Sequence, residues 1–341
     1  MAKIIPFRGI LYNVSKVSME DVMAPPYDII TPEYREALYM QSHYNVVKID
    51  FGKEETGDNE TKNKYTRARG YLDAWIKEGI FIRSGKPSLY VYEMSYMIHD
   101  VKKHLLGFLC LVKLEELGKG SIYPHECTHS KPKQDRLNLM RSCQANTSPI
   151  FSLYKSQEEG ISKILSKIFG TKPYIESADI SGDTHRLWQI DDTNDIEIIK
   201  KELEDKAIFI ADGHHRYETA FEFYREMSAK DASTTDRPFD HVLMFLANML
   251  DEGITILPTH RLLKEIPKDL NKILHTSEIG YEMDVNRALD KVKSGEFSAA
   301  FFLNPTKVED VEKSALSAVR MPPKSTYFYP KLLTGLVISK F

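Results

Sequence analysis

The sequence predicts an α+β (mixed α/β) fold, in which helices and strands alternate irregularly and not as repeated βαβ units. Apolar residues recur at helical spacing between residues 62 and 78 and again from Tyr217 onward. Short apolar runs bounded by turn residues, at 89–97, 104–114 and 207–211, are typical of strands. With 341 residues and 42% hydrophobic content, the chain is long enough for one large core or two domains.

Residues 1–117 are expected to form an N-terminal α/β region. Residues 2–14 suggest one strand and a turn, and the two prolines of Ala24-Pro-Pro-Tyr-Asp28 impose a stiff, extended segment. Thr31 is placed to cap a short helix that begins with proline. Residues 52–61 are polar and rich in turn formers, which predicts a surface loop before the next helix.

Residues 118–264 are expected to form the core that carries the chemistry, and 265–341 a C-terminal α/β segment that packs on it. Within the core, 228–238 is predicted to be a surface loop. Residues 241–257 predict two strands joined by the turn at 251–253. The C-terminal segment is expected to contain a helix, a strand and a second helix.

The most informative motif is Ala207-Ile-Phe-Ile-Ala-Asp-Gly-His-His-Arg216, which places a buried strand, an Asp212-Gly213 turn and a helix in succession. His214, His215 and Arg216 therefore occupy the first helical turn. Cations are disfavoured there, because the N-terminus of a helix carries partial positive charge. A bound anion, held by the backbone N–H groups and these side chains together, would resolve the conflict. The alternative is a solvated turn whose histidines have no role.

Composition narrows the class of protein. The net charge of −3 removes the main argument for bulk nucleic-acid binding. No apolar run approaches the roughly 20 residues that span a bilayer, so we expect no membrane partner. Cys110, Cys127 and Cys143 form no Cys-x-x-Cys pair, which fits a reduced, cytoplasmic setting. P-loop, Gly-x-Gly-x-x-Gly and Gly-x-Ser-x-Gly motifs are absent, so those three mechanisms lack support. The sequence does not indicate an oligomeric state.

His125-Glu-Cys-Thr-His129 matches the His-Glu-x-x-His pattern of zinc hydrolases. Pro124 before the motif and Pro132 soon after it disfavour the long helix that such a site needs. Without a metal, His125 and Glu126 remain an adjacent pair capable of acid and base chemistry. A solvated polar loop is the third interpretation.

Further candidate ligands of phosphate lie on a helix, at a strand end and on a proline-rich turn. Arginine can clamp phosphate with two hydrogen bonds, whereas lysine acts as a point charge. The candidates are Arg136 and Arg141, then His260 and Arg261, then Lys324 and Ser325. Each can also be an ordinary solvated side chain. Asn248, at the end of a predicted strand, is a candidate to orient a ligand or to cap a turn.

Seven motifs occur in one order over nearly the whole chain, and together they resemble a large bacterial and archaeal family known as a domain of unknown function. They are Ala24-Pro-Pro-Tyr-Asp28, Pro124-His-Glu126 with Thr128, Asp135-Arg-Leu137, Ser148-Pro-Ile-Phe151, Asp212 to Ala220, Pro258-Thr-His-Arg261 and Pro322 to Lys331. The Asp-Gly-His-His-Arg box looks like the phosphate-binding box of the ParB/sulfiredoxin-like superfamily, which includes free serine kinases. The resemblance implies a ParB/sulfiredoxin-like phosphate-binding core with additional N- and C-terminal elements.

Some members of the family are described as pyrophosphate-dependent kinases of free L-serine. The resemblance therefore implies a small-molecule phosphotransferase that makes O-phosphoserine. Asp212 matches the box aspartate, which is implicated in catalysis or in organising Mg²⁺ and phosphate. Gly213, His214, His215 and Arg216 match its anion-binding part, and we group His215 with Asp212 as catalytic.

Three assignments rest on chemistry alone. Glu126 is nominated as the base that takes the proton of the acceptor hydroxyl. Tyr27 and Asp28 are nominated to hold the amino acid, with Asp28 meeting its ammonium group. His129 departs from the family pattern. The alternatives are an ATP- or ADP-dependent amino-acid kinase, a zinc hydrolase, and a ParB-like nucleotide- or DNA-binding protein.

Overall fold

The computed structural model describes residues 2–126, 130–230, 237–266 and 279–341. Its contacts divide the chain into two compact units. The first comprises Met1–Pro124, Thr128–Gly253 and Pro330–Phe341, and the second His125–Cys127 and Ile254–Tyr329. These bounds differ from the three segments expected from the sequence (1–117, 118–264 and 265–341), because strands from before and after residue 117 share one sheet.

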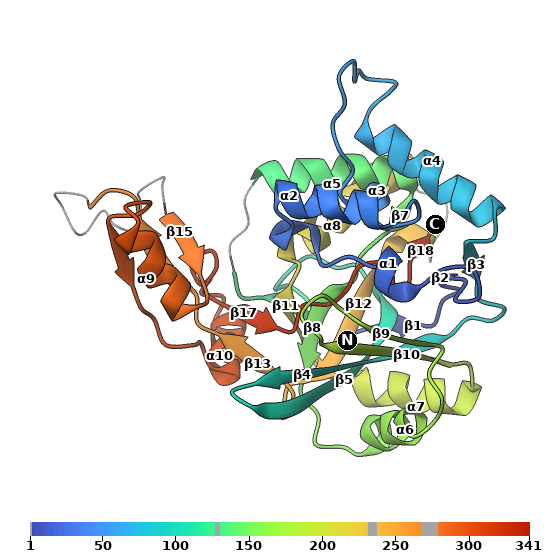
Figure 1. The fold of residues 1–341 in the computed structure, drawn as a ribbon. Coiled ribbons are helices and arrows are strands. Elements are labelled where there is room, and N and C mark those ends of the chain that lie inside the picture. The colour runs from blue at the N-terminus through green and yellow to red at the C-terminus, as the bar shows by residue number, and fades with distance from the viewer. Residues whose placement is uncertain (1, 127–129, 231–236, 267–278) are drawn as a thin grey trace. The chain divides into compact units, whose positions relative to one another are not determined.

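The first unit is built on a nine-stranded sheet in the order β6-β11-β8-β12-β5-β4-β10-β9, with β1 paired to β5 (Figure 1). Its strands are β1 (Ile4–Ile5), β4 (Leu89–Ile98), β5 (Val101–Lys113), β6 (Ile122–Pro124), β8 (Ile150–Tyr154), β9 (Ile175–Ala178), β10 (Thr184–Ile190), β11 (Ile208–Asp212) and β12 (His241–Asn248). The β11–β6 and β12–β8 pairs are parallel and the other pairs of this sheet are antiparallel. This mixed sheet confirms the predicted α+β class.

The remaining elements of the first unit are mostly helices. They are α1 (Met19–Val22), η1 (Tyr27–Ile29), α2 (Pro32–Gln41), α3 (Val47–Asp50), α4 (Lys64–Lys77), α5 (Ser130–Cys143), α6 (Gly160–Phe169), α7 (Thr193–Leu203), α8 (His214–Lys230) and η2 (Pro238–Asp240). Two short antiparallel pairs complete the unit: β2 (Ile10–Tyr12) with β3 (Phe81–Arg83), and β7 (Ala145–Asn146) with β18 (Ser339–Lys340). Thr31 caps α2 as predicted, accepting a hydrogen bond from the Tyr34 backbone N–H.

One large apolar cluster lies against a face of the sheet. Strand β12 is apolar along most of its length, as expected of a strand that is buried on both faces. Side chains such as Phe108 of β5 and Met244 of β12 pack in one cluster with apolar residues of α6, α7 and α8. Tyr217 lies in this cluster, and Phe221 packs against it. The predicted apolar stripe of the helix is therefore confirmed.

Gly107 marks a close approach between two central strands. A Cβ atom there would lie 2.4 Å from the Leu246 carbonyl oxygen and 2.6 Å from Phe245 Cζ. Because the first of these atoms belongs to the backbone, we expect Gly107→Ala to lower the free energy of unfolding by about 1–3 kcal/mol, measured by urea denaturation. Gly70→Ala is the control, since that Cβ meets nothing within 4 Å. In the interior of α4 it should instead stabilise by about 0.5–1 kcal/mol. Equal effects of the two variants would contradict this packing.

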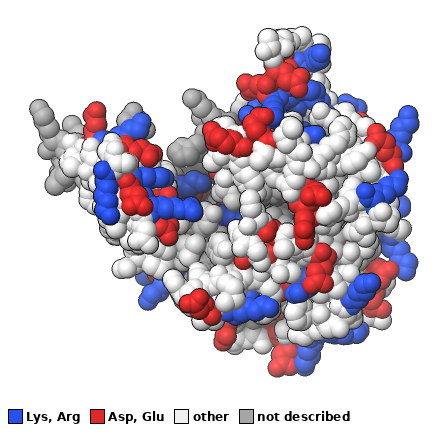
Figure 2. All heavy atoms as spheres, viewed as in Figure 1, with Lys and Arg blue, Asp and Glu red and all other residues white. Residues whose placement is uncertain are grey.

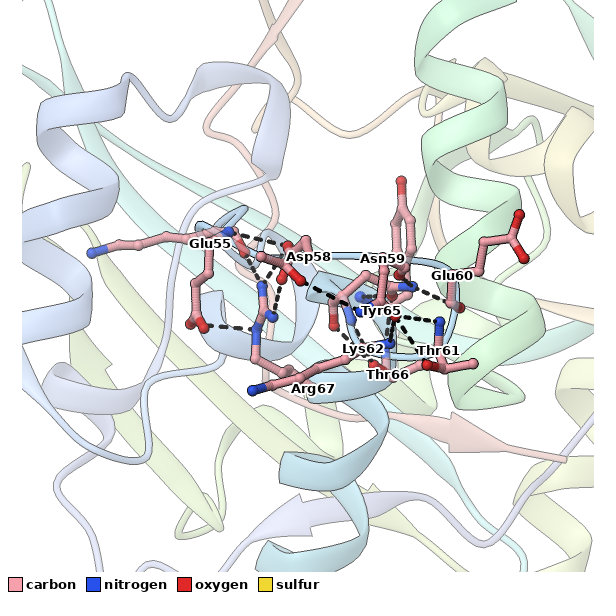
Figure 3. A network of polar contacts seen from close by, with 12 residues as sticks. Glu55, Asp58, Asn59, Glu60, Thr61, Lys62, Tyr65, Thr66 and Arg67 are labelled. Atoms are coloured by element: carbon pink, nitrogen blue, oxygen red, sulfur yellow. Dashed lines mark hydrogen bonds and ion pairs between the residues drawn. The ribbon is translucent and has the colours of Figure 1, made fainter.

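The polar loop predicted at 52–61 is present and is tied to the start of α4 (Figure 3). Arg67 donates two hydrogen bonds to the Asp58 carboxylate, at 2.5 and 2.9 Å. Asn63 and Thr66 form a capping box at the helix start. Tyr65, the second residue of α4, donates a hydrogen bond from its hydroxyl to Asp135 Oδ1 at 2.9 Å. The loop is therefore linked through α4 to α5.

The described part of the second unit forms two small sheets and two helices. Their bounds are β13 (Thr255–Leu257) and β17 (Tyr327–Tyr329), then β14 (His260–Leu263), β15 (Ile279–Glu282) and β16 (Ala299–Phe301), with α9 (Val285–Lys293) and α10 (Val308–Leu316). The predicted helix, strand and helix correspond to α9, β16 and α10. The predicted strand pair at 241–257 is present as β12 and β13, but the two strands belong to different sheets. Strands β14, β15 and β17 were not predicted. Because β14 begins at His260, His260 and Arg261 lie within a strand and not at the end of the preceding one.

Basic and acidic side chains are interspersed on the face of the molecule drawn in Figure 2. This mixture agrees with the small net charge of −3. Within the described part of the chain, no helix has the length and apolar character needed to cross a membrane.

Candidate functional site

The predicted strand–turn–helix junction is present. Strand β11 ends at Asp212, and α8 begins at His214. Gly213 between them has φ +94°, in the left-handed region that favours glycine. A Cβ there would also lie 2.8 Å from Arg216 Nε. The positive φ therefore favours glycine at this turn, and a larger residue would also have to displace the Arg216 side chain.

The Asp212 carboxylate lies between two cations. Its Oδ2 is 3.3 Å from Arg216 Nη2 and 3.5 Å from Lys331 Nζ. Arg216 Nη1 also donates to the carbonyl oxygen of Pro149, which fixes the guanidinium between the helix and the segment before β8. The register of β11 against β8 shifts between Ile210 and Asp212. The half-buried carboxylate thus sits at the irregular end of the strand.

The two histidines of the motif differ in exposure. His214 is buried, with 6% of its surface exposed, whereas His215 is half-buried. Arg216 is largely covered as well, because its side chain is only 11% exposed. Of the three cation-capable residues at the start of α8, His214 is therefore buried, while His215 and Arg216 are both partly exposed.

Arg136 and Tyr27 lie together in the same unit, as the prediction of a shared site requires. The Arg136 guanidinium carbon is 4.2 Å from the Tyr27 ring centroid. Arg136 pairs with Asp135 at 2.6 Å and with the buried Asp50 at 3.4 Å. Burial raises the pKa of Tyr27 to about 12, although the positive charges of Arg136 and Arg216 act in the opposite direction. Tyr27 is therefore a neutral hydroxyl at physiological pH.

Three other predicted residues of this unit have different surroundings. Arg141 pairs with Glu226 of α8, which lies twelve positions after His214, roughly 18 Å along the helix axis. Asp28 is exposed in η1. Asn248 donates to the Ser156 carbonyl at 2.7 Å and accepts from the backbone N–H of Leu250. Its amide therefore caps a turn, which was the second of the two predicted roles.

The remaining candidates belong to the second unit. His125 is buried and its Nε2 forms a 3.0 Å hydrogen bond with Thr326 Oγ1. The adjacent Glu126 is half-buried and forms an isolated bridge with Met321. Arg261 lies 4.7 Å from the Tyr281 ring centroid. Burial lowers the pKa of Arg261, while the Glu126 carboxylate acts to raise it.

Three polar residues of this unit complete the predicted set. His260 is buried, and its Nδ1 accepts from the Leu303 backbone N–H. Ser325 donates to the Pro322 carbonyl, and Lys324 has φ +60°. The predicted ligands are thus divided between the two units.

The zinc interpretation depends on His129, which lies outside the described residues. Among those that are described, no group of three or more His, Cys, Asp and Glu side chains is arranged to hold a metal ion. A single carboxylate such as Asp212 could take part in binding Mg²⁺, because Mg²⁺ is commonly bound by one or two carboxylates together with phosphate oxygens.

Sequence reasoning missed Lys331 as a site residue. The lysine ends the Pro322 to Lys331 motif, so the motif itself was the available signal. What the sequence does not show is that residues 330–341 return to the first unit. That return brings Lys331 to Asp212.

The acid stability of the site should depend on Asp135. Burial raises the pKa of this carboxyl, but the charge of Arg136 and the hydrogen bond from Lys64 outweigh burial and lower the pKa from 3.8 to about 2. A carboxyl whose pKa falls on folding contributes stability that is present above pH 4 and is lost as the pH falls through 2. We expect Asp135→Asn to flatten the decline of unfolding free energy between pH 4 and pH 2, measured by urea titration at each pH. The exposed Asp310→Asn is the control, and identical slopes for both variants would contradict the assignment.

Fold and site together define a mixed α/β protein in which a tight Asp-Gly turn joins a buried strand to a helix that begins with His-His-Arg. The family model described as "Protein of unknown function (DUF1015)" matches residues 4–319, so the chain belongs to this family. No curated protein matches the chain. Among solved structures, a mutant free serine kinase in complex with AMP is similar, with 12% identity, 63% of this chain and 93% of that chain covered, and a TM-score of 0.33.

Proposed function

We propose that this protein is a small-molecule phosphotransferase, a kinase that converts free L-serine to O-phosphoserine with pyrophosphate as the phosphoryl donor. The observation that carries the proposal is the Asp212 carboxylate between Arg216 and Lys331 at the start of α8. A helix N-terminus with two adjacent cations suits a polyphosphate. Serine and pyrophosphate come from the family resemblance, and a reduced, cytoplasmic setting belongs to the same proposal.

Phosphoryl transfer asks the protein to fix the donor, to neutralise charge on its oxygens and to hold the acceptor in line. In our proposal Arg216 and Lys331 supply the charge, and the backbone N–H groups at the start of α8 orient the donor, with His215 facing it. The bond between the bridging oxygen and the transferred phosphorus breaks, and the serine hydroxyl oxygen forms the new bond to that phosphorus. Inorganic phosphate leaves, and the hydroxyl proton passes to a base.

Two parts of the proposal rest on chemistry. Asp212 would hold Mg²⁺ together with donor oxygens, and the ion would supply further charge neutralisation. Glu126 is our proposal for the base, and Glu126→Gln tests it through the pH dependence of the rate. If Glu126 is the base, the variant loses the acidic limb of the pH–rate profile along with most of its activity.

The experiment for the reaction itself is phosphorus NMR of the purified protein with Mg²⁺ and L-serine, given pyrophosphate, ATP or ADP in separate samples. We expect the phosphoserine resonance with pyrophosphate. If phosphoserine forms with ATP or ADP but not with pyrophosphate, the protein is still a phosphotransferase and the proposed donor is wrong. If no donor yields a phosphorylated product from serine, threonine or glycerol, the proposed function is wrong.

A further inference from the structure

A small cavity in the first unit is lined by Arg216 of the proposed phosphate turn, by Arg136, and by residues such as Asn146 that the sequence did not indicate. Its volume is about 30 Å³, enough for a few non-hydrogen atoms. Arg136 of α5 and Arg216 of α8 both line it. Asn146, Thr147 and Ser148, from the segment between α5 and β8, line it as well. Its other walls are mainly aliphatic.

Two residues that line this cavity each carry a buried donor that makes no hydrogen bond to the described residues. Asn146 is only 4% exposed, and its Nδ2 has no hydrogen-bond partner. Arg136 is 7% exposed, and its Nη1 likewise makes no hydrogen bond. That nitrogen lies 3.4 Å from Asp50 Oδ2, a contact at ion-pair distance without hydrogen-bond geometry. Buried donors rarely lack a hydrogen-bond partner in folded proteins, so each of these two needs an explanation.

The residues that line the cavity indicate which class of ligand it can bind. Among the described residues that line the cavity there are two arginines and no carboxylate. A cation would be repelled, and an apolar group would leave both donors unsatisfied. An oxyanion accepts from guanidinium and amide groups together, and guanidinium recognises carboxylate and phosphate alike. Water is the competing occupant, because it can also accept from both donors.

Arg216 connects this cavity to Asp212. Its Nη2 lies 3.3 Å from the Asp212 carboxylate, while the same side chain lines the cavity. An anion in the cavity would therefore share one guanidinium with the group bound at the turn. A substrate with a second anionic group would be held at both ends, with its reacting atom near Asp212.

We infer that this cavity is an oxyanion subsite, filled by a carboxylate or phosphoryl group of the substrate. Its catalytic meaning rests on the proposed function, whereas its affinity for an anion does not. Asn146 is the specificity-determining donor, since it is neutral and its Nδ2 makes no hydrogen bond to any residue that the structure describes. The substrate class is thus a small molecule that carries an anionic group besides the one bound at the Asp212 turn.

The test is anion binding by Asn146→Leu, measured by calorimetry and by the rise in melting temperature with ligand. Inorganic phosphate and pyrophosphate probe the phosphoryl source. L-serine against serinol, which lacks the carboxylate, probes the carboxylate source. We expect the wild type to bind one of these anions and Asn146→Leu to bind it at least about tenfold more weakly. Asn138→Leu makes the same substitution on α5 at a half-buried residue outside the cavity, and it should bind as the wild type does.

Asn146→Asp keeps the test decisive if the leucine variant folds poorly. A carboxylate beside Arg136 and Arg216 should raise the melting temperature of the free protein and weaken anion binding further, so the two readouts move in opposite directions. Wild-type affinity in both Asn146 variants, or no anion binding by the wild type, would leave water as the occupant and overturn the inference. Asn146-dependent binding without phosphoserine formation would retain the subsite and reject the proposed function. Phosphoserine formation with unchanged anion affinity in the variants would retain the proposed function and reject the subsite.

Discussion

Asp212→Asn is expected to lower the rate of phosphoserine formation from pyrophosphate and serine by at least about a hundredfold. Asparagine keeps the shape of the side chain but removes the charge that faces Arg216 and Lys331. It also removes the carboxylate that we propose to hold Mg²⁺. The initial rate by phosphorus NMR, over a series of Mg²⁺ concentrations, measures the loss.

The matched control for Asp212 is Asp73→Asn. Asp73 is also a carboxylate with two cationic neighbours, Lys340 at 2.6 Å and Arg69 at 3.6 Å, but it is half exposed on α4. The control should keep the wild-type rate. Urea denaturation of both variants separates lost chemistry from lost folding. Full activity in a folded Asp212→Asn variant would remove the central residue of the proposal.

The junction at Asp212 could be predicted from the sequence because all of its signals are local. A buried apolar run, an Asp-Gly turn and a helical stripe from Tyr217 follow one another within a few residues. Strand β11 and helix α8 accordingly lie where they were expected. Gly213 adds the positive φ that the turn requires. Local propensity and tertiary structure agree here, so little context was needed.

The surroundings of the junction could not be predicted, because they come from distant parts of the chain. Lys331 reaches Asp212 only because the chain returns from the second unit. Asn146 shows its role only through the cavity it lines, since an isolated asparagine after a helix suggests no more than a turn. Arg141, by contrast, was predicted as a phosphate ligand because it follows Arg136 on the same helix. Its partner is Glu226, which lies far along α8 from the Asp212 turn.

The largest expected effect on stability belongs to the buried pair of Asp50 and Arg136. The two side chains are 3% and 7% exposed, and Thr147 donates its hydroxyl to Asp50 Oδ1 at 2.7 Å. Asp50→Ala would leave the buried Arg136 with one of its two carboxylate partners, Asp135, and would leave the Thr147 hydroxyl without its acceptor. We expect Asp50→Ala to lower the free energy of unfolding by about 3–5 kcal/mol, measured by urea denaturation.

The control is the double variant Asp50→Leu with Arg136→Met, which removes both charges and keeps apolar volume. It should regain most of the stability, because the desolvation penalty of both ions disappears with their attraction. A loss below about 1 kcal/mol in Asp50→Ala would contradict the prediction, because it would mean that the buried pair contributes little to the free energy of unfolding. A double variant no more stable than Asp50→Ala would place the loss in packing instead.

The same pair connects stability to the cavity. In Asp50→Asn, Arg136 keeps Asp135 as its partner, but its Nη1 no longer faces a carboxylate charge. An anion in the cavity would then meet a larger net positive charge. Inorganic phosphate should therefore raise the melting temperature of Asp50→Asn more than that of the wild type. Equal shifts would mean that Arg136 serves the fold alone, and that the donors of the cavity do not act on an anion together.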